Sequence, residues 1–283
     1  MGDAFYQVER WLYLKSKILD EPAYSKEIFD QLTRHKFERV LDCGCGAGDF
    51  ARILMEKGVF FEELMGFDIN PQLVEIGQKN LEAHANIKLQ VHNLYDEEAN
   101  NRFRDFDLVT GQALLEHTNM EKAVPILKSF SKPGGYLYFP HNYMSPTMFL
   151  PIFDNAVDRA VVQNFDRFSI ENQVFCDEVC GDSSTGAKLY NVFKKHGFEV
   201  IHFTTTDWLL YPKGGSYTDE EKEVLYIILD FFYDANRNER LPVSRRIHPK
   251  VLEDWRITRF RQIEDSELVY ICPQTSILLR NPG

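Results

Sequence analysis

The sequence predicts an α/β fold with a parallel, doubly wound sheet. Short apolar segments alternate with segments of helical periodicity between about residues 39 and 139. Strands separated by single helices pair in parallel through right-handed crossovers. A glycine-rich loop at residues 44–48 follows the first strand, and an acidic residue ends the second. Because ligands of such sheets bind at the carboxyl ends of the strands, we expect a site there.

The composition favours a folded protein that binds no nucleic acid. Among 283 residues, 32 Lys and Arg stand against 43 Asp and Glu, a formal net charge of −11. Hydrophobic residues make up 44% and aromatic residues 13%, so intrinsic disorder is not expected. Nonspecific nucleic-acid binding requires clustered cations to replace phosphate counterions, and the net charge disfavours it.

Targeting signals are not evident in the sequence. No stretch approaches the ~20 apolar residues needed to span a bilayer, and no basic region followed by an apolar one opens the chain. The five cysteines are an odd number, which fits reduced thiols better than a disulfide framework. We therefore expect a cytoplasmic protein with no membrane partner, present as a monomer or homodimer.

The N-terminal residues predict a helical cap, residues 1–37. An amphipathic helix is expected over residues 5–19 and a second helix over residues 25–34. The face of the first helix carries, at helical spacing, Val8, Trp11, Leu12, Lys15 and Leu19.

The first two strand–helix units follow the cap. Residues 39–43 form an apolar run that ends in small residues, as a buried parallel strand does, and a helix over residues 50–57 ends at a glycine. A second strand is expected at residues 64–68. Pro71 then stands in the first turn of a helix reaching about His84, where proline costs little.

Three further strands complete the regular part. The third and fourth are expected at residues 87–92 and 106–110, and a helix over residues 120–130 follows them. The Pro-Gly-Gly turn at residues 133–135 leads into the fifth strand at residues 136–139.

Regularity ends after the fifth strand. The remaining expected elements are a helix over residues 184–196, a strand at 199–207, helices at 219–236 and 249–264, and a last strand at 267–279, where Pro273 predicts a bulge or break. We interpret residues 1–283 as a single domain in which residues 143–183 and 212–266 are lid insertions.

The glycine loop and the acid after it indicate a nucleotide-type ligand. Alternating glycines let the backbone turn sharply and approach a ligand closely. Asp49 stands where the dinucleotide fingerprint has its third glycine, which disfavours an NAD-dependent oxidoreductase. Asp68 can accept hydrogen bonds from both hydroxyls of a ribose. The alternative role for Asp68 is a helix N-cap, for which Asn70 is better placed.

Four motifs in order resemble those of the class I S-adenosylmethionine-dependent methyltransferases. They are Asp42-x-Gly44-x-Gly46-x-Gly48, Gly66-Phe67-Asp68-Ile69, residues 107–117 and residues 133–137. The resemblance covers about residues 38–140, and the strand start at residues 197–200 is similar more loosely. It implies a Rossmann-like, seven-stranded methyltransferase sheet, mostly parallel with an antiparallel last strand and with helices on both faces.

The resemblance also implies S-adenosyl-L-methionine as cofactor, with S-adenosyl-L-homocysteine as product. Asp42 would hold the cofactor ammonium, Asp68 the ribose hydroxyls, and Gln112 would face the methionine end. Asn93 stands where many relatives have an aspartate for the adenine amino group, and an amide oxygen can accept the same bond. The implied cofactor residues are Asp42, Gly44, Gly46, Gly48, Asp68, Ile69, Asn93, Leu94 and Gln112.

Candidate catalytic and substrate residues follow the fourth and fifth strands. Imidazole exchanges protons near neutral pH, so His117 and His141 are candidate catalytic residues. The alternative is a capping or packing histidine for His117 and an ordinary polar loop for His141. Candidate substrate contacts are Tyr6, Glu116, Asn142, Tyr143 and Trp208. The alternative is an ordinary polar loop for Asn142 and Tyr143, and an anchor for the following insertion for Trp208. No metal site is expected, because the cysteines lack a second ligand pair at zinc spacing.

The predicted function is in-line methyl transfer to O, N or C of a small-molecule acceptor. A lidded pocket suits a small substrate, whereas a macromolecule would require an open face. The alternatives are an RNA or protein methyltransferase, or an inactive module that retains cofactor affinity.

Overall fold

A computed structural model describes residues 2–96, 100–170, 173–175 and 178–283. Within these ranges, the side chains of residues 2–8, 168–169, 174–175 and 178–179 are not described. The strands are β1 (Lys36–Cys43), β2 (Phe60–Asp68), β3 (Ile87–Val91), β4 (Phe106–Thr110), β5 (Ser131–Tyr143), β6 (Met148–Leu150), β7 (Val174–Phe175), β8 (Glu178–Val179), β9 (Glu199–Leu210) and β10 (Val269–Arg280).

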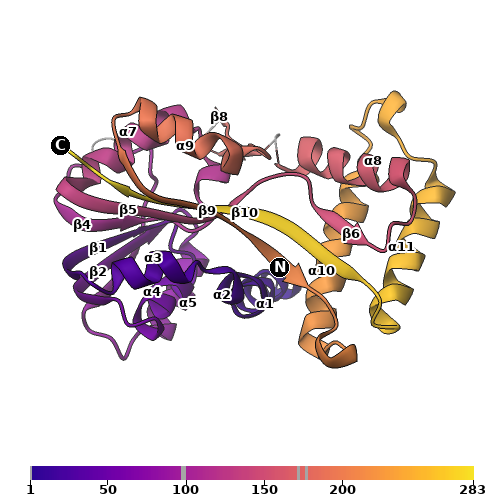
Figure 1. Cartoon of the computed structure of the whole chain (residues 1–283), viewed down its shortest axis with the longest axis horizontal. Coiled ribbons are helices and arrows are strands. Elements are labelled where there is room, and N and C mark those ends of the chain that lie inside the picture. Colours follow the sequence, from indigo (N-terminus) through magenta and orange to yellow (C-terminus); the bar gives the residue numbers. More distant parts are fainter. Residues whose placement is uncertain (1, 97–99, 171–172, 176–177) are drawn as a thin grey trace.

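Helices surround the sheet (Figure 1). The α-helices are α1 (Gly2–Lys15), α2 (Glu21–Ala23), α3 (Lys26–Leu32), α4 (Asp49–Glu56), α5 (Pro71–Asn80), α7 (Met120–Phe130), α8 (Asn155–Phe165), α9 (Thr185–Lys195), α10 (Asp219–Asn236) and α11 (Pro249–Glu264). Two π-helical turns (Ser16–Asp20 and Asp166–Ile170) and three 3-10 turns (Leu115–His117, Lys213–Gly215 and Val243–Arg245) interrupt the connections.

The main sheet has eight strands in the order β3-β2-β1-β4-β5-β10-β6, and β9 pairs with the other edge of β10. The strands from β3 to β5 are parallel, whereas β10 is antiparallel to β5, β6 and β9. The predicted mostly parallel sheet with an antiparallel last strand is therefore confirmed. The eighth strand, β6, continues the edge of β10 beyond the end of β5 and was not predicted.

Successive side chains of the strands point to opposite faces of the sheet, and each face is covered by helices. On β5, Leu137 and Phe139 pack in the cluster that includes α7 and α9, while Tyr138 between them packs with α3, α4 and α5. The side chains of β10 divide in the same way, since Ile277 and Leu279 face the first cluster and Leu278 the second. This alternation of period two confirms helices on both faces.

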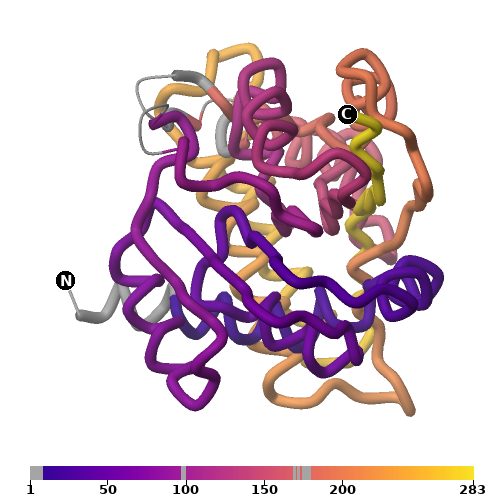
Figure 2. The backbone as a smooth tube through the Cα atoms, turned by 90° about the vertical axis from the view of Figure 1, so that its left-hand side faces the viewer, coloured from indigo at the N-terminus to yellow at the C-terminus, as the bar shows by residue number. Residues whose placement is uncertain are grey.

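A helical annex, formed by α8, α10 and α11, lies beside the α/β part (Figure 1). Its buried core includes Phe149, Val161, Leu225, Phe232 and Trp255. The long strands β9 and β10 extend from the sheet toward it, and in Figure 2, which is viewed from the side of the α/β part, the annex lies behind. Helices from the two segments that the sequence suggested as insertions thus pack against each other.

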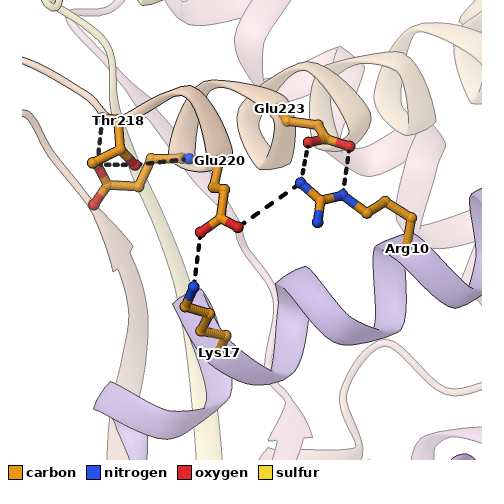
Figure 3. Close-up of polar contacts among 6 residues, drawn as sticks. Arg10, Lys17, Thr218, Glu220 and Glu223 are labelled. Atoms are coloured by element: carbon orange, nitrogen blue, oxygen red, sulfur yellow. Dashed lines mark hydrogen bonds and ion pairs between the residues drawn. The ribbon is translucent and has the colours of Figure 1, made fainter.

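The N-terminal helix bridges the two parts. Trp11 of α1 contacts Phe231 of α10 edge to face, with ring centroids 5.3 Å apart. Arg10 donates from Nε and Nη2 to the Glu223 carboxylate at 3.1 and 2.7 Å, and Lys17 Nζ lies 2.9 Å from Glu220 (Figure 3). Figure 3 also shows Thr218, whose side chain caps the start of α10.

Three sequence expectations need correction. The helix expected over residues 5–19 becomes a π-helical turn at Ser16. Pro273 does not break β10 or its pairing with β9, because it lies where the other edge of β10 passes from β6 to β5. The register irregularity of β10 against β5 lies slightly later, between Thr275 and Ile277. The segment at residues 143–183, which was expected to be irregular, contains β6, three residues long, and α8, an 11-residue helix that was not predicted.

Candidate active site

Two adjoining cavities lie at the carboxyl ends of β1, β2 and β4. The first has a volume of about 210 Å³ and the second about 280 Å³. Both are lined by Gly44, Asp68, Gln112, Ala113 and His117. Because β1 and β4 are neighbours from which the chain proceeds to opposite sides of the sheet, this is the switch point where open α/β sheets bind ligands.

The first cavity is largely apolar. Ile69, Leu94 and Leu114 line it together with the predicted Asn93. Asn93 Oδ1 accepts the backbone N–H of Tyr95 at 3.0 Å, which fixes the side chain at the cavity wall. The apolar walls, with the amides of Asn93 and Gln112 at their edge, suit a flat heteroaromatic group such as adenine.

Asp68 ends β2 between the two cavities. Its Oδ2 accepts the Gly46 N–H at 3.0 Å and its Oδ1 accepts the Asn70 N–H at 2.8 Å. Each carboxylate oxygen keeps a further lone pair for a ligand hydroxyl. Asn70 itself caps α5, as the sequence predicted, by accepting the backbone N–H groups of Gln72 and Leu73.

Gly46 and Gly48 of the glycine loop have different structural roles. All of Gly44, Gly46 and Gly48 have positive φ. A Cβ added at Gly46 would meet no protein atom within 4 Å, so a side chain there would project into the second cavity, which Gly46 lines. At Gly48, the N-cap of α4, an added Cβ would lie 2.6 Å from Leu81 Cδ1. Gly46 therefore leaves room for a ligand, and Gly48, which lines neither cavity, permits close packing.

Asp42 is a buried acid without a partner. Asp42 lines the second cavity and is only 1% exposed. No group among the described residues donates a hydrogen bond to either of its carboxylate oxygens. Burial, with the negative charge of Asp68, raises the pKa of Asp42 to about 8. Such a carboxylate is costly to bury alone, so a ligand ammonium fits this position.

The N-terminal segment forms one wall of the second cavity. Lys15 Nζ lies 2.8 Å from Asp20 Oδ2, to which Gln112 Nε2 donates at 2.6 Å. Tyr24 donates in turn to Gln112 Oε1 at 2.5 Å. Asp20 is 2% exposed, its Oδ1 has no partner, and burial raises its pKa despite Lys15. The network fixes Gln112 at the junction of the two cavities.

Lys15, Asp20 and Tyr24 were not predicted as site residues from the sequence. One signal was available, because Lys15 stood on the otherwise apolar face of the N-terminal helix. Asp20 had none, since its position depends on the π-helical turn at residues 16–20, which brings Lys15 and Asp20 together. Such turns occur frequently at functional sites.

Glu116 and His117 follow β4. Glu116 is 8% exposed and lines the second cavity, its Oε2 accepts the Tyr143 N–H at 2.7 Å, and burial raises its pKa. Its Oε1 lies 3.5 Å from His117 Nε2, and the other ring nitrogen of His117 lies 2.5 Å from Gln173 Oε1. His117 lines both cavities, so its imidazole stands where a proton could leave an acceptor.

Four other predicted residues lie outside both cavity walls. His141 is fully buried at positive φ against Tyr24, its ring nitrogens have no partner, and burial lowers its pKa well below the usual value. Asn142 donates to backbone carbonyls of β5 and β10, and the Tyr143 hydroxyl donates to Asp166 at 2.7 Å. Lys15 Nζ lies over the Trp208 ring, 4.8 Å from the ring centroid.

The described residues contain neither a candidate metal site nor a candidate membrane-spanning helix. They contain no group of three or more His, Cys, Asp or Glu arranged to hold a metal ion. None of the described helices is both long and apolar enough to cross a membrane. The side chain of Tyr6 lies outside the described residues, so its predicted substrate role stays a prediction.

The sheet order, the glycine loop and the acid at the end of β2 define an α/β protein that binds a nucleoside-containing cofactor. A family model described as a methyltransferase domain matches residues 17–203, more than half of the chain. The chain therefore belongs to this methyltransferase family, and it is an S-adenosylmethionine-dependent methyltransferase. No curated protein sequence matches it significantly.

Solved structures share the fold at low sequence identity. A Bacillus halodurans protein assigned as a methyltransferase is 16% identical, with a TM-score of 0.54, over 91% of this chain and 100% of that one. A chain from the complex between the Haloferax volcanii Trm112 methyltransferase activator and a methyltransferase is 14% identical, with a TM-score of 0.54, over 99% and 97%. At these identities the likeness concerns the fold alone.

Proposed function

We propose that the chain methylates an O, N or C atom of a small-molecule acceptor in the second cavity. The observation that carries this proposal is the position of the N-terminal segment, since Trp11, Leu12, Lys15 and Ser16 line that cavity. A wall built from a separate segment narrows access in a way that suits a small acceptor. Ion pairs between α1 and α10 brace this wall against the annex (Figure 3).

The cofactor would lie across both cavities. In this proposal Ile69, Asn93 and Leu94 hold the adenine, and Asp68 accepts the ribose hydroxyls. The unpartnered carboxylate of Asp42 holds the ammonium, and the open face of Gly46 admits the methionine chain. Lys15 is the one lysine or arginine among the described residues lining the second cavity, so we assign the cofactor carboxylate to it.

Bound S-adenosylmethionine supplies an electrophilic methyl group on a sulfonium. The protein has to align the acceptor with that group, exclude water and remove a proton where the acceptor carries one. Gln112, held by Asp20 and Tyr24, orients the methionine end in this proposal. His117 accepts the acceptor proton, and Glu116 beside it stabilises the resulting imidazolium.

A library of small metabolites, screened for release of S-adenosylhomocysteine, tests the acceptor class. Release that depends on one small molecule supports the proposal and excludes an inactive module. Methyl incorporation into RNA or protein, with no release from any small molecule, would replace it by the macromolecular alternative. His117→Ala should then lower turnover with the identified acceptor by about 100-fold if His117 is the base. Unchanged turnover would remove His117 from that role.

The ribose contact gives a prediction for cofactor binding. Asp68→Ala should weaken S-adenosylmethionine binding about 10- to 100-fold, because two hydrogen bonds to a charged acceptor are lost. Calorimetry measures the change. Asp30→Ala, on the exposed surface of α3, is the matched control and should bind as the wild type does. Equal affinities for the two variants would show that Asp68 does not hold the ribose.

A further inference from the structure

The second cavity carries more negative charge than the cofactor can balance. Five carboxylates line it: Asp20, Asp42, Asp49, Asp68 and Glu116. Among the described lining residues, Lys15 is the one lysine or arginine, and His117 adds charge only when protonated. S-adenosylmethionine has two positive groups and one negative group. With the cofactor bound and every carboxylate ionised, three negative charges stay uncompensated.

Two of these carboxylates have oxygen atoms that no group of the protein satisfies. Both oxygens of Asp42 and Oδ1 of Asp20 are buried without a partner, and the two residues are 1% and 2% exposed. The cofactor ammonium can satisfy one of these sites, which leaves the other open. Burial raises the pKa of each acid, so a second cation would favour its ionised form.

We infer that the methyl acceptor is an amine that enters the second cavity as its ammonium cation; this inference rests on the proposed small-molecule activity. An anionic acceptor, such as a carboxylate or phosphate, would add to the negative surplus. An amine lowers that surplus, because its ammonium can satisfy the open oxygen of Asp20 and also bind Glu116, which lines the same cavity beside His117.

The chemistry balances with the groups present. The ammonium gives one proton to His117 and becomes a neutral amine. The nitrogen lone pair then forms an N–C bond to the methyl carbon as the C–S bond breaks with its electron pair moving to sulfur. The positive charge passes from sulfur to nitrogen, so the carboxylates face a cation before and after transfer. Methylation of a carboxylate or phenolate would instead cancel the positive charge of the sulfonium against the negative charge of the acceptor. No cation would then face the carboxylates after transfer.

Matched panels of linear, branched and aromatic skeletons test the inference. Each skeleton is supplied as an amine, an alcohol and a carboxylate, and S-adenosylhomocysteine release and N-methyl product are measured by mass spectrometry. We expect release with amine members only. Methylation of alcohols or carboxylates but not amines would overturn the inference while leaving small-molecule methylation standing. Release from a library compound that has no amine, with none from any panel amine, would also overturn the inference alone. Methyl incorporation into RNA or protein only would overturn the proposed function and the inference together.

A binding measurement assigns the contact to Glu116. In the complex with S-adenosylhomocysteine, Glu116→Gln should weaken calorimetric binding of the active amine about 10- to 100-fold, since a charge-assisted bond is lost. Its amide oxygen can still accept the Tyr143 N–H, and affinity for S-adenosylhomocysteine alone should stay within about threefold. Glu75→Gln, on the exposed surface of α5, is the charge-matched control. Unchanged amine affinity in Glu116→Gln would overturn the inferred contact.

Discussion

The helical annex and the second cavity differ in whether the protein supplies partners for their acidic groups. In the annex, Asp158 accepts hydrogen bonds from Trp255 Nε1 at 2.8 Å, Arg259 Nη2 at 2.7 Å and the Phe153 N–H at 2.9 Å. In the second cavity, Asp42 has no donor on either oxygen. The annex thus satisfies a partly buried carboxylate, with a side chain 16% exposed, from within the protein, whereas the cavity leaves a fully buried one for a ligand.

The two kinds of acidic group contribute to different properties, the stability of the fold and the binding of a ligand. Partnered buried charges hold an arrangement together, and removing one partner is costly. An unpartnered buried charge destabilises the free protein and contributes only when a ligand of opposite charge arrives. Substitutions in the two regions should therefore have opposite consequences for stability and for cofactor affinity.

The largest expected effect lies in the annex. Arg259→Met should lower the free energy of unfolding by about 3 to 5 kcal/mol, because Arg259 is fully buried and its loss leaves Asp158 without its cation. Arg256→Met on the same helix removes a partly exposed pair with Asp230 and should cost about 1 kcal/mol or less. Chemical denaturation measures both. Equal losses would contradict the structural role assigned to the buried pair.

A pH-dependent effect of intermediate size is expected at Asp42. Its pKa is about 8 in the folded protein against an ordinary value of 3.8, so the folded state binds the proton more tightly. The contribution of this group to stability is then full at low pH and is lost as pH rises toward 8.

Asp42→Asn removes that titration. The stability of the variant relative to wild type should rise by about 1.4 kcal/mol per pH unit, or about 3 kcal/mol from about pH 5.5 to 7.5. Urea denaturation across this range measures the slope, and the same variant should bind S-adenosylmethionine more weakly. A stability difference that does not change with pH would show that Asp42 does not titrate in this window.

The smallest expected effect concerns the link between the two regions. Arg10 and Glu223 are both partly exposed, so Arg10→Ala should lower the free energy of unfolding by only about 0.5 to 1 kcal/mol. Because α1 lines the second cavity, we also expect S-adenosylmethionine to dissociate faster, which stopped-flow fluorescence can follow. A double-mutant cycle with Glu223→Ala isolates the pair. Faster dissociation with no coupling energy would mean that Arg10 acts through another contact.

Much of the α/β part could be predicted from the sequence. Each parallel strand is an apolar run followed by a turn residue, and the signals of strand and helix are local. The annex was harder to predict as a unit. Its helices α10 and α11 were predicted, but their packing against α8 depends on contacts such as Asp158 with Arg259, which are 101 positions apart in sequence. No local pattern encodes such a pairing.

Some residues of the candidate site could also be predicted from local motifs, and others depend on the tertiary structure. Asp42, Asp68 and Gln112 belong to ordered motifs, so the sequence could place them at the strand ends. Asp20 could not be placed, because it reaches the cavity only through the π-helical turn after α1. His141 was predicted to face the substrate, because it directly follows the fifth predicted strand. In the structure Tyr24 of the N-terminal segment packs against it, a contact that no local pattern in the sequence indicates.

The π-helical turn at Ser16–Asp20 makes the N-terminal segment tolerant of a deletion at one place and sensitive to it at another. Such a turn holds one residue more than regular α-helical bonding would need. Loss of a single codon between Lys15 and Asp20 would let the backbone close into an ordinary helix, and these two residues, five positions apart in the turn, would become four apart and still share a face. Loss of a codon between Trp11 and Lys15, within the regular part of α1, would instead rotate every preceding side chain by about 100° relative to those that follow. The place of a reading-frame-preserving deletion, rather than its size, thus decides whether this wall of the cavity survives.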